Sequence, residues 1–170
     1  AFDGPLYILC VYDFDSNYIR AEPLDSNSAP DVRDAYKRAL DFFRQSGYSP
    51  SFLRLDNATS GILETFPASE NITFQFVAPS NHRANIAERA IQTWKNHFVS
   101  TICGTDPDFP LQYWSDLVLQ AEITLNLVRS SRVTPNQSSY QHVTGKPYDF
   151  NACPIAPLGT KVLVYDAPKD

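Results

Sequence analysis

The segment from about His82 to Cys103 does most to constrain how this chain folds. Its apolar residues recur at intervals of three and four, a pattern that predicts one long amphipathic helix ended by Gly104. The stripe expected to face the core consists of Ala87, Ile91, Trp94, Phe98 and Ile102. Such a stripe has to be covered by another layer of structure, so the rest of the chain must supply a sheet or further helices.

The remaining elements follow from turn residues and apolar spacing. Residues 7–24 predict two strands around the turn Asp15-Ser16-Asn17, and residues 30–46 predict a helix that begins at Pro30 and ends at Gly47. The stripe expected on that helix consists of Val32, Ala35, Tyr36, Ala39 and Phe43. We expect further strands at 52–55 and 72–79, with a short helix at 60–66 between them.

The second half is expected to be mostly helical. A second long helix is predicted from the connector 106–110 to about Ser130, with Leu111, Trp114, Val118, Ala121, Leu125 and Val128 facing inward. A short helix follows from Pro135 through Val143, and KVLVYD (161–166) is a possible final strand. Taken in order, these elements predict an α/β fold, with a mixed sheet and helices packed on it.

Composition fits a globular chain of one domain, or one domain plus a tail. The chain has 170 residues, of which 43% are hydrophobic and 19% charged, and no apolar run approaches the roughly 20 residues of a membrane span. The first ten residues lack the features of a signal peptide and lack Met, which predicts a fragment or processed product that is not secreted. The widely spaced Cys10, Cys103 and Cys153 are expected to be reduced, with the first two in buried positions. A net charge of −5 argues against a general nucleic-acid binder, so any such role depends on local clustering of Lys and Arg.

Two carboxylates are the best candidates for chemistry. Asp56 closes the short apolar run SFLRLDN (51–57), and Glu88 lies one turn into the long helix. A strand-end acid and a helix-borne acid that converge can hold a divalent metal ion against phosphate. Each also has an ordinary structural interpretation: Asp56 as a turn residue, and Glu88 as part of a solvated helix face stabilised by Lys.

The neighbours of Glu88 favour the functional interpretation. Glu88, Gln92 and Lys95 follow at i, i+4 and i+7, so they share one flank of the helix. The helix is also locally basic, with His82, Arg83, Arg89, Lys95 and His97. The histidine spacing fits no zinc motif, and neither a nucleophile elbow nor a phosphate-binding glycine loop is present.

The motif LDN (55–57) followed by NIAER inside NHRANIAERAIQTWKNHF resembles the Asp-Asp-Glu catalytic core of retroviral and retrotransposon integrases. The match is closest to cores from transposable elements of protists and algae. It extends over nearly the whole chain, through YDFDSNYIRAEPL, DPDFPLQYWSDLVLQAEITLNLVRSSR and SSYQHVTGKPYDFNACPIAPLGTKV. The resemblance implies a ribonuclease-H-like fold, in which a mixed five-stranded sheet is flanked by helices, over residues 1–150. Residues 151–170 form a C-terminal extension with a possible short strand.

The same resemblance implies metal-dependent polynucleotidyl transfer on DNA, with Mg²⁺ or Mn²⁺ as cofactor. Asp56 and Glu88 match the second and third catalytic acids and metal ligands. The nucleic-acid-binding positions it implies are Lys95, Gln92, Arg89, Arg83 and Asn85. The implied partners are DNA (element ends and target DNA) and further copies of the chain, with no membrane. The implied location is the nucleus, with a cytoplasmic stage in virus-like particles.

The chain departs from the family pattern at its start. In this family the first catalytic Asp lies on the strand before the one that reads YILCVYDF here, so the first strand of the sheet is expected to be missing or truncated in this chain. That places the first Asp upstream of Ala1, with Asp13 and Asp3 as less suitable substitutes. The alternative is therefore an inactive or domesticated integrase-derived domain that binds nucleic acid or protein without catalysis. A plain α/β domain with no nucleic-acid role is the third hypothesis.

Overall fold

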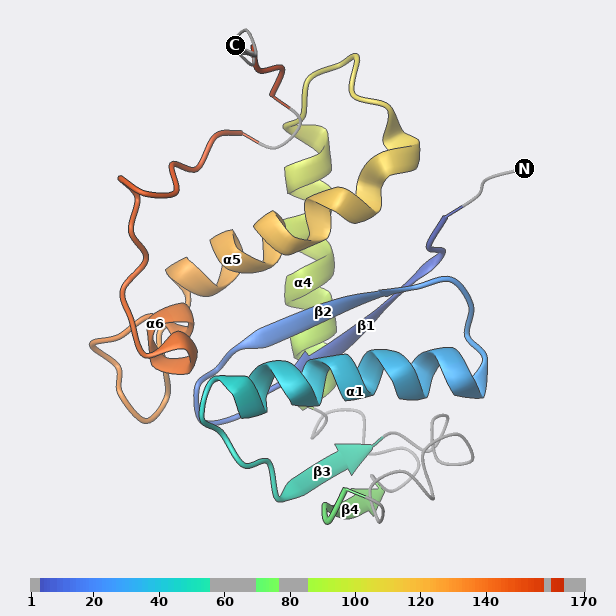
Figure 1. Ribbon diagram of the computed structural model, residues 1–170, viewed down its shortest axis with the longest axis vertical. Coiled ribbons are helices and arrows are strands. Elements are labelled where there is room, and N and C mark those ends of the chain that lie inside the picture. The colour runs from blue at the N-terminus through green and yellow to red at the C-terminus, as the bar shows by residue number, and fades with distance from the viewer. Residues whose placement is uncertain (1–3, 56–69, 77–85, 158–159, 164–170) are drawn as a thin grey trace, which may run out of the picture.

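The computed structural model describes residues 4–55, 70–76, 86–157 and 160–163 of the chain. Figure 1 shows the arrangement of the elements. In chain order they are β1 (Tyr7–Tyr12), β2 (Ile19–Leu24), α1 (Ala29–Gln45), β3 (Phe52–Leu55), β4 (Thr73–Phe76), α4 (Ile86–Cys103), the 3₁₀ helix η3 (Leu111–Leu117), α5 (Val118–Val128) and α6 (Ser139–Thr144).

The described strands form two pairs of opposite type. β1 and β2 are antiparallel, with Tyr7 opposite Leu24 and Tyr12 opposite Ile19, whereas β3 and β4 are parallel. The chain therefore contains both kinds of pairing, as the predicted mixed sheet requires. Among the described residues the two pairs are separate sheets, so the five-stranded sheet of the ribonuclease-H-like fold is present in truncated form.

Helix α1 begins and ends within one residue of its predicted bounds. The Ser28 side chain accepts a hydrogen bond from the backbone N–H of Asp31, and Pro30 occupies the first turn. Just past the last turn, Gly47 adopts φ +87°, a conformation that is easy only for glycine. The whole expected stripe is buried, and Leu40 joins it.

The β1–β2 hairpin separates two cores, as Figure 1 shows with α1 on one side and α4 and α5 on the other. Ile19 and Ala21 of β2 pack against a cluster from α4, η3 and α5 that includes Trp94. Leu24 packs against the buried stripe of α1 and against Ile72. The alternation of side chains along a strand is what allows one short hairpin to serve both layers.

The register of two helices differs from the prediction. In α4 the buried residues are Ala90, Trp94 and Phe98, whereas Ile91 is 48% exposed. The small Ala90 allows close approach to the hairpin, and Ile91 is rotated by about 100° around the helix from that line.

The second long helix is interrupted near its start. Its first seven residues are the 3₁₀ helix η3, with non-helical angles at Tyr113, before α5 begins at Val118. The change of winding removes Leu111 from the buried line of α5, and Val128 is the last residue of that helix; both are exposed, so the predictions for both are wrong.

Three further predictions concern the ends of elements and the thiols. The short helix before Gly145 begins at Ser139 rather than at Pro135. Residues 161–163 are not in a strand, and the helix expected at 60–66 lies outside the described residues. All three cysteines are free, but Cys103 is exposed rather than buried. In the described segments, no helix has both the length and the apolar character that crossing a membrane requires.

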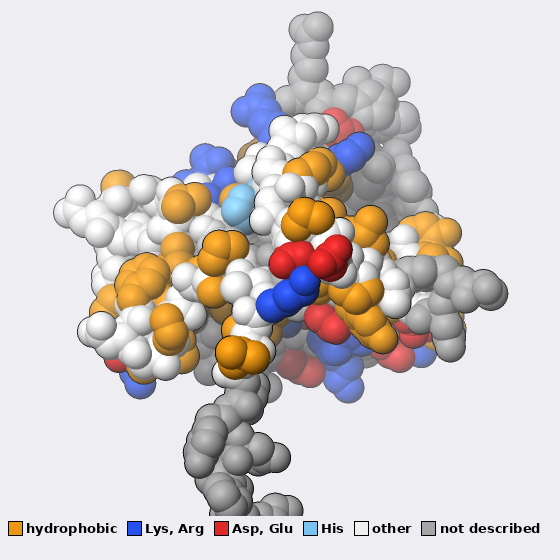
Figure 2. All heavy atoms as spheres, turned by 90° about the horizontal axis from the view of Figure 1, so that it is seen from above, with side chains coloured by type: hydrophobic (Ala, Val, Ile, Leu, Met, Phe, Trp, Pro, Cys, Tyr) orange, Lys and Arg blue, Asp and Glu red, His pale blue; other side chains and the backbone are white. Residues whose placement is uncertain are grey.

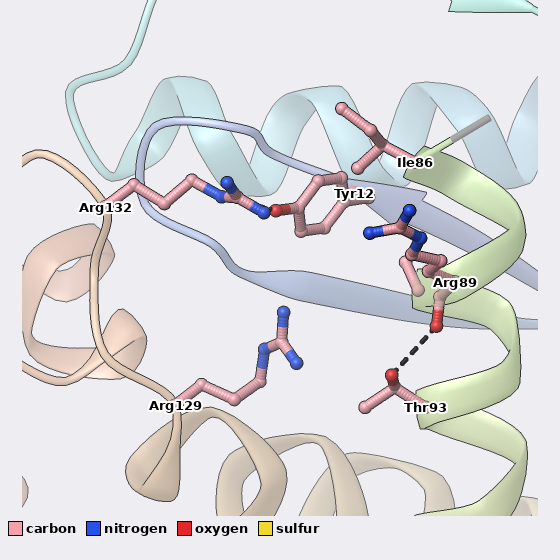
Figure 3. A pocket seen from close by; sticks show the side chains of 7 residues that line it. Tyr12, Ile86, Arg89, Thr93, Arg129 and Arg132 are labelled. Atoms are coloured by element: carbon pink, nitrogen blue, oxygen red, sulfur yellow. Dashed lines mark hydrogen bonds between the residues drawn. The ribbon is translucent and has the colours of Figure 1, made fainter. Parts of the chain in front are cut away.

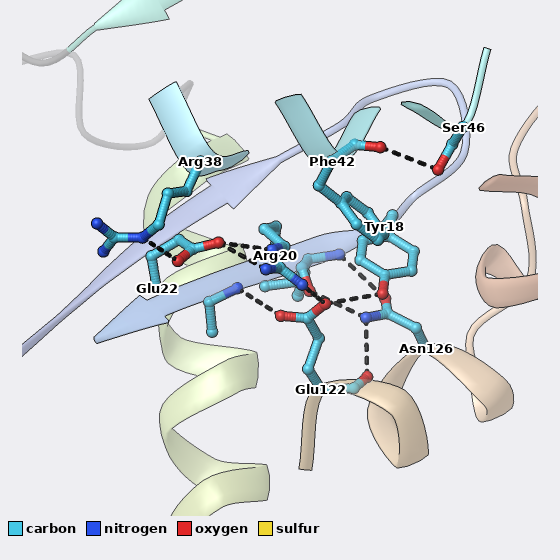
Figure 4. A network of polar contacts seen from close by, with 10 residues as sticks. Tyr18, Arg20, Glu22, Arg38, Phe42, Ser46, Glu122 and Asn126 are labelled. Atoms are coloured by element: carbon cyan, nitrogen blue, oxygen red, sulfur yellow. Dashed lines mark hydrogen bonds and ion pairs between the residues drawn. The ribbon is translucent and has the colours of Figure 1, made fainter. Parts of the chain in front are cut away.

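Side chains from α5 close the outer edge of β2 (Figure 4). Asn126 accepts a hydrogen bond from the N–H of Ile19 at 3.0 Å and donates one to its carbonyl at 2.9 Å. The Glu122 carboxylate accepts the N–H of Ala21 at 2.9 Å. These contacts satisfy backbone groups that a neighbouring strand would otherwise pair with, so this edge of the sheet is protected.

Candidate functional site

The predicted catalytic flank lies on α4, away from the helix's buried face. Glu88 is half-buried, whereas Gln92 and Lys95 are exposed. Gln92 donates a 2.7 Å hydrogen bond to the Asn96 side chain, one turn further along the helix. The three positions i, i+4 and i+7 share one face, as expected, and that face is open to solvent beyond Glu88.

Three of the predicted site residues lie outside the described part of the chain: Asp56, Arg83 and Asn85. The metal-site hypothesis depends on the distance between Asp56 and Glu88, and the described residues therefore do not include both ends of that distance. Asp3 also lies outside. Asp13, the other substitute acid, accepts hydrogen bonds from the backbone N–H (2.9 Å) and the hydroxyl (2.5 Å) of Ser16, so its carboxylate closes the β1–β2 turn.

A basic hollow, which residue spacing did not predict, lies next to this flank. It has a volume of about 170 Å³ and is lined by Tyr12, Ile86, Arg89, Ala90, Thr93, Arg129 and Arg132. Figure 3 shows the arginine side chains entering from different segments and pointing toward the same space. Arg89 comes from α4, and Arg129 and Arg132 come from the segment that follows α5. We call this feature the arginine hollow.

The turn between β1 and β2 fixes two of these arginines. Asn17 adopts φ +61°, and its side-chain and main-chain oxygens accept hydrogen bonds from the guanidinium of Arg129. The Tyr12 hydroxyl donates to the Asn17 side chain at 2.9 Å and accepts from Nε of Arg132 at 3.0 Å. The Arg132 guanidinium also lies 4.6 Å from the centre of the Phe14 ring. The left-handed Asn17 thus helps to join the hairpin turn to the end of α5.

The arginine hollow is positively charged. Among its described lining residues there is no carboxylate, and no ion pair of the described residues includes Arg89, Arg129 or Arg132. Burial lowers the pKa of Arg129 from its ordinary value, and the charge of Arg132 acts in the same direction, whereas Tyr12 opposes it. Arginine remains protonated in proteins, so the two charges repel each other and an anion between them would relieve that repulsion.

Basic residues do not cover the face of the molecule that Figure 2 draws. On the face drawn in Figure 2, hydrophobic side chains are more numerous than charged ones, and the Lys and Arg side chains lie apart from one another. Together with the net charge of −5, this restricts any strongly anion-binding surface to a local site.

Whether the candidate residues suit a divalent metal ion depends on the chemistry of their donor atoms. Glu88 supplies the hard carboxylate oxygen that Mg²⁺ prefers, and Asp56 would supply a second one. Across 4–55, 70–76, 86–157 and 160–163, no group of three His, Cys, Asp or Glu side chains is placed to hold a metal ion. Any complete metal site would therefore need residues beyond those ranges.

Comparisons with known proteins identify the fold. The integrase core of BIV superposes with a TM-score of 0.57 at 18% sequence identity, and covers 81% of this chain and 85% of that one. The core of HTLV-2 integrase, solved in complex with magnesium in a trimeric form, gives a TM-score of 0.60 at 17% identity over 79% of this chain and 82% of its own. The chain has the fold of retroviral integrase catalytic cores. The resemblance noted in the sequence is thereby confirmed at the level of the ribonuclease-H-like fold.

A third solved structure extends the match along the chain. The simian T-cell lymphotropic virus intasome, in complex with the PP2A regulatory subunit B56 gamma, gives a TM-score of 0.62 at 16% identity. It covers 94% of this chain but 58% of the matched one, so this chain corresponds to part of that integrase. No family model matches the sequence, and no curated protein matches it.

Sequence reasoning found Arg89 but missed Arg129 and Arg132. The signal available was the run NLVRSSR at the end of the second long helix, which carries two arginines just past the last apolar residue. That run shows where positive charge lies along the chain. It does not show that the charge meets α4.

Proposed function

We propose that this chain is the catalytic core of a retroelement integrase that carries out metal-dependent polynucleotidyl transfer, comprising 3′-end processing and strand transfer, on DNA. The observation that carries the proposal is the integrase-core fold over about four fifths of the chain, with the half-buried Glu88 on α4 within the motif NIAER. The fold by itself supports many chemistries, so the acid within this motif is what selects the reaction.

Each predicted residue has a role in this proposal. Asp56 and Glu88 hold Mg²⁺ or Mn²⁺, which when bound activates a water or a 3′-hydroxyl group and stabilises the leaving oxygen. Lys95 and Gln92, on the same face as Glu88, contact the DNA end, and Arg83, Asn85 and Arg89 contact its backbone. One of the neighbouring integrase cores was solved with magnesium, which supports the choice of metal.

The proposed partners are the element's DNA ends, target DNA and further copies of the chain, acting in the nucleus. Support for assembly comes from the neighbours, since HTLV-2 integrase cores were solved in dimeric and trimeric forms and another match is an intasome.

The test is a strand-transfer assay with Mg²⁺ or Mn²⁺. It uses the chain together with the protein's residues upstream of Ala1, where the resemblance places the first catalytic Asp. We expect Glu88→Gln to reduce strand transfer by about a thousandfold or more, because losing one metal-holding acid removes most of the charge stabilisation at the reacting phosphate. DNA binding without metal should be unchanged.

Asp34→Asn is the matched control, because Asp34 is an exposed acid on α1 that contacts only Arg33 at 4.0 Å among described ion pairs. Strand transfer that survives Glu88→Gln would overturn the role given to Glu88. DNA binding without any metal-dependent transfer would instead favour an integrase-derived domain that binds without catalysis.

A further inference from the structure

The geometry points to a phosphate-binding site in the arginine hollow: we propose that Arg129 and Arg132, together with Arg89, hold a phosphodiester group of a nucleic-acid strand. Arg129 and Arg132 lie in the segment after α5. They are therefore not among the DNA-binding residues proposed above, which lie on α4 or just before it in the sequence. This inference rests on the proposed function and adds a second element to its DNA-binding surface.

The protein itself fixes the positions of two of the arginines that would bind an anion. Hydrogen bonds to Asn17 and Tyr12 hold Arg129 and Arg132 in place. Because their geometry is already fixed, binding costs less side-chain conformational entropy than it would for arginines free in solvent. Two guanidinium groups held close together without an acid are destabilising in themselves, and a bound anion offsets that repulsion.

Charge in the surroundings does not neutralise the site. The acids on the adjoining turn are Asp13, which is hydrogen-bonded to Ser16, and Asp15, which is exposed. Neither forms an ion pair with the three arginines among the described contacts. The side chain of Arg89 has no hydrogen-bond partner among the described residues, so its donors are available to a ligand.

The size of the hollow selects a projecting group rather than a whole small molecule. Its volume of about 170 Å³ lies below the roughly 300–1,000 Å³ typical of small-molecule sites. A phosphate projecting from a strand can enter such a hollow while its sugars and bases remain outside. Arginine is well suited to this, because its planar fork matches two phosphate oxygens at once.

The position of the hollow relative to Glu88 favours a nucleic-acid backbone. Arg89 follows Glu88 directly, so the two side chains leave α4 about 100° apart around the helix axis. A strand whose reacting phosphate lies at Glu88 can therefore continue over α4 toward the hairpin turn and place a later phosphate in the hollow. The hollow would act by positioning the strand, and Arg129 and Arg132 are positioning residues rather than catalytic ones.

The test measures binding of a fluorescently labelled DNA duplex by anisotropy, without metal and over a series of salt concentrations. We expect Arg132→Gln and Arg89→Gln each to weaken binding about threefold to tenfold and to reduce the slope of log K against log salt by about 0.9. Arg33→Gln is the matched control, since Arg33 is an exposed arginine on α1 that should leave both quantities unchanged. Arg129→Gln is not the principal variant, because it would also release the Asn17 turn.

Two results would overturn the proposal. One is duplex binding by Arg132→Gln and Arg89→Gln that equals that of the parent chain in affinity and salt slope. The other combines two measurements: inorganic phosphate raises the Tm of the parent chain but not that of Arg132→Gln, while the two proteins bind the duplex equally well. That result would make the hollow a site for small anions. Either result leaves the Glu88 test intact, because strand transfer that depends on Glu88 does not require the hollow.

Discussion

Glu122 is the most deeply buried acid among the described residues, with only 1% of its surface exposed. Its carboxylate accepts hydrogen bonds from the Tyr18 hydroxyl (2.8 Å), the Arg20 guanidinium (2.9 Å) and the Ala21 N–H (2.9 Å). Arg20 in turn contacts Glu22, and Arg38 reaches Glu22 from α1 at 3.0 Å (Figure 4). Four donors and two acceptors, from α1, α5, β2 and the turn before β2, thus satisfy one another, which is the condition under which buried charge is tolerated.

Removing Glu122 should therefore destabilise the fold strongly. We expect Glu122→Ala to lower the free energy of unfolding by about 3 kcal/mol, because it leaves Arg20 and the Ala21 N–H without their partner. The measurement is urea denaturation, with an unchanged m value. Glu70→Ala is the comparison, since Glu70 makes a more exposed ion pair with Arg44 and should cost less than about 1 kcal/mol. Equal losses for the two variants would contradict the role of the network.

The thiols should separate into two classes. Burial raises the pKa of the Cys10 thiol to about 12, and the charge of Glu122 adds to the effect. The thiolate is the reactive form, so at pH 8 a thiol reagent should modify the exposed Cys103 and Cys153 quickly and Cys10 only on unfolding. Because the folded chain holds this proton more tightly than the unfolded chain, its contribution to stability is present below the ordinary thiol pKa and is lost as the pH rises toward 12.

The measurement is the kinetics of thiol modification in native buffer and in urea. In the parent chain we expect two fast thiols and one slow thiol, and in Cys10→Ala only the two fast ones. Three equally fast thiols under native conditions would show that Cys10 is accessible.

At the scale of elements, α6 depends on the residue that ends it. Gly145 adopts φ +72° and donates its N–H to the Gln141 carbonyl at 2.9 Å. A Cβ at this position would meet no atom within 4 Å, so the cost of Gly145→Ala comes from the backbone alone. We expect a loss of about 1–2 kcal/mol in the free energy of unfolding.

Gly104, which ends α4, is the matched control. A Cβ there would lie 3.5 Å from two carbonyl oxygens, an ordinary contact, and Gly104 is not among the described glycines with positive φ. Gly104→Ala should therefore change stability by less than about 0.5 kcal/mol in the same urea measurement. A loss as large as that of Gly145→Ala would show that the backbone angle is not what distinguishes the two sites.

Local sequence patterns predicted where the helices and strands lie better than they predicted which side chains of each helix are buried. For α1, Pro30 in the first turn, the stop at Gly47 and the buried stripe were predicted from local patterns and are confirmed, with the helix lying one residue earlier at each end. For the second long helix the same reasoning was wrong about Leu111, because spacing does not encode the 3₁₀ turn there, and about Val128, which is the exposed last residue of α5. It also overlooked Glu122 and Asn126, since a polar residue in an apolar stripe is normally assigned to the solvent side.

At the scale of the whole molecule, an acidic chain contains a concentrated positive site, the arginine hollow. The net charge of −5 opposes general attraction of DNA, and the arginine hollow can bind phosphate only because its three charges meet from separate segments. Association with DNA should therefore depend on a few contacts and have a shallow salt dependence compared with a protein that has a broad basic face. The layered arrangement makes this possible, because the hairpin turn holds the end of α5 against the first turns of α4.

The sequence by itself determined the position of α1 to within one residue, its buried stripe, the α/β class and the resemblance whose fold the structure confirms. The roles of all the predicted site residues remain predictions, and Asp56, Arg83 and Asn85 also lie outside the described part of the chain. Only the tertiary structure decided that Asn126 and Glu122 close the edge of β2 and that Arg129 and Arg132 meet Arg89. The physical reason is separation along the chain: Asn17 and Arg129 are 112 positions apart, and periodicity carries information over only a few turns.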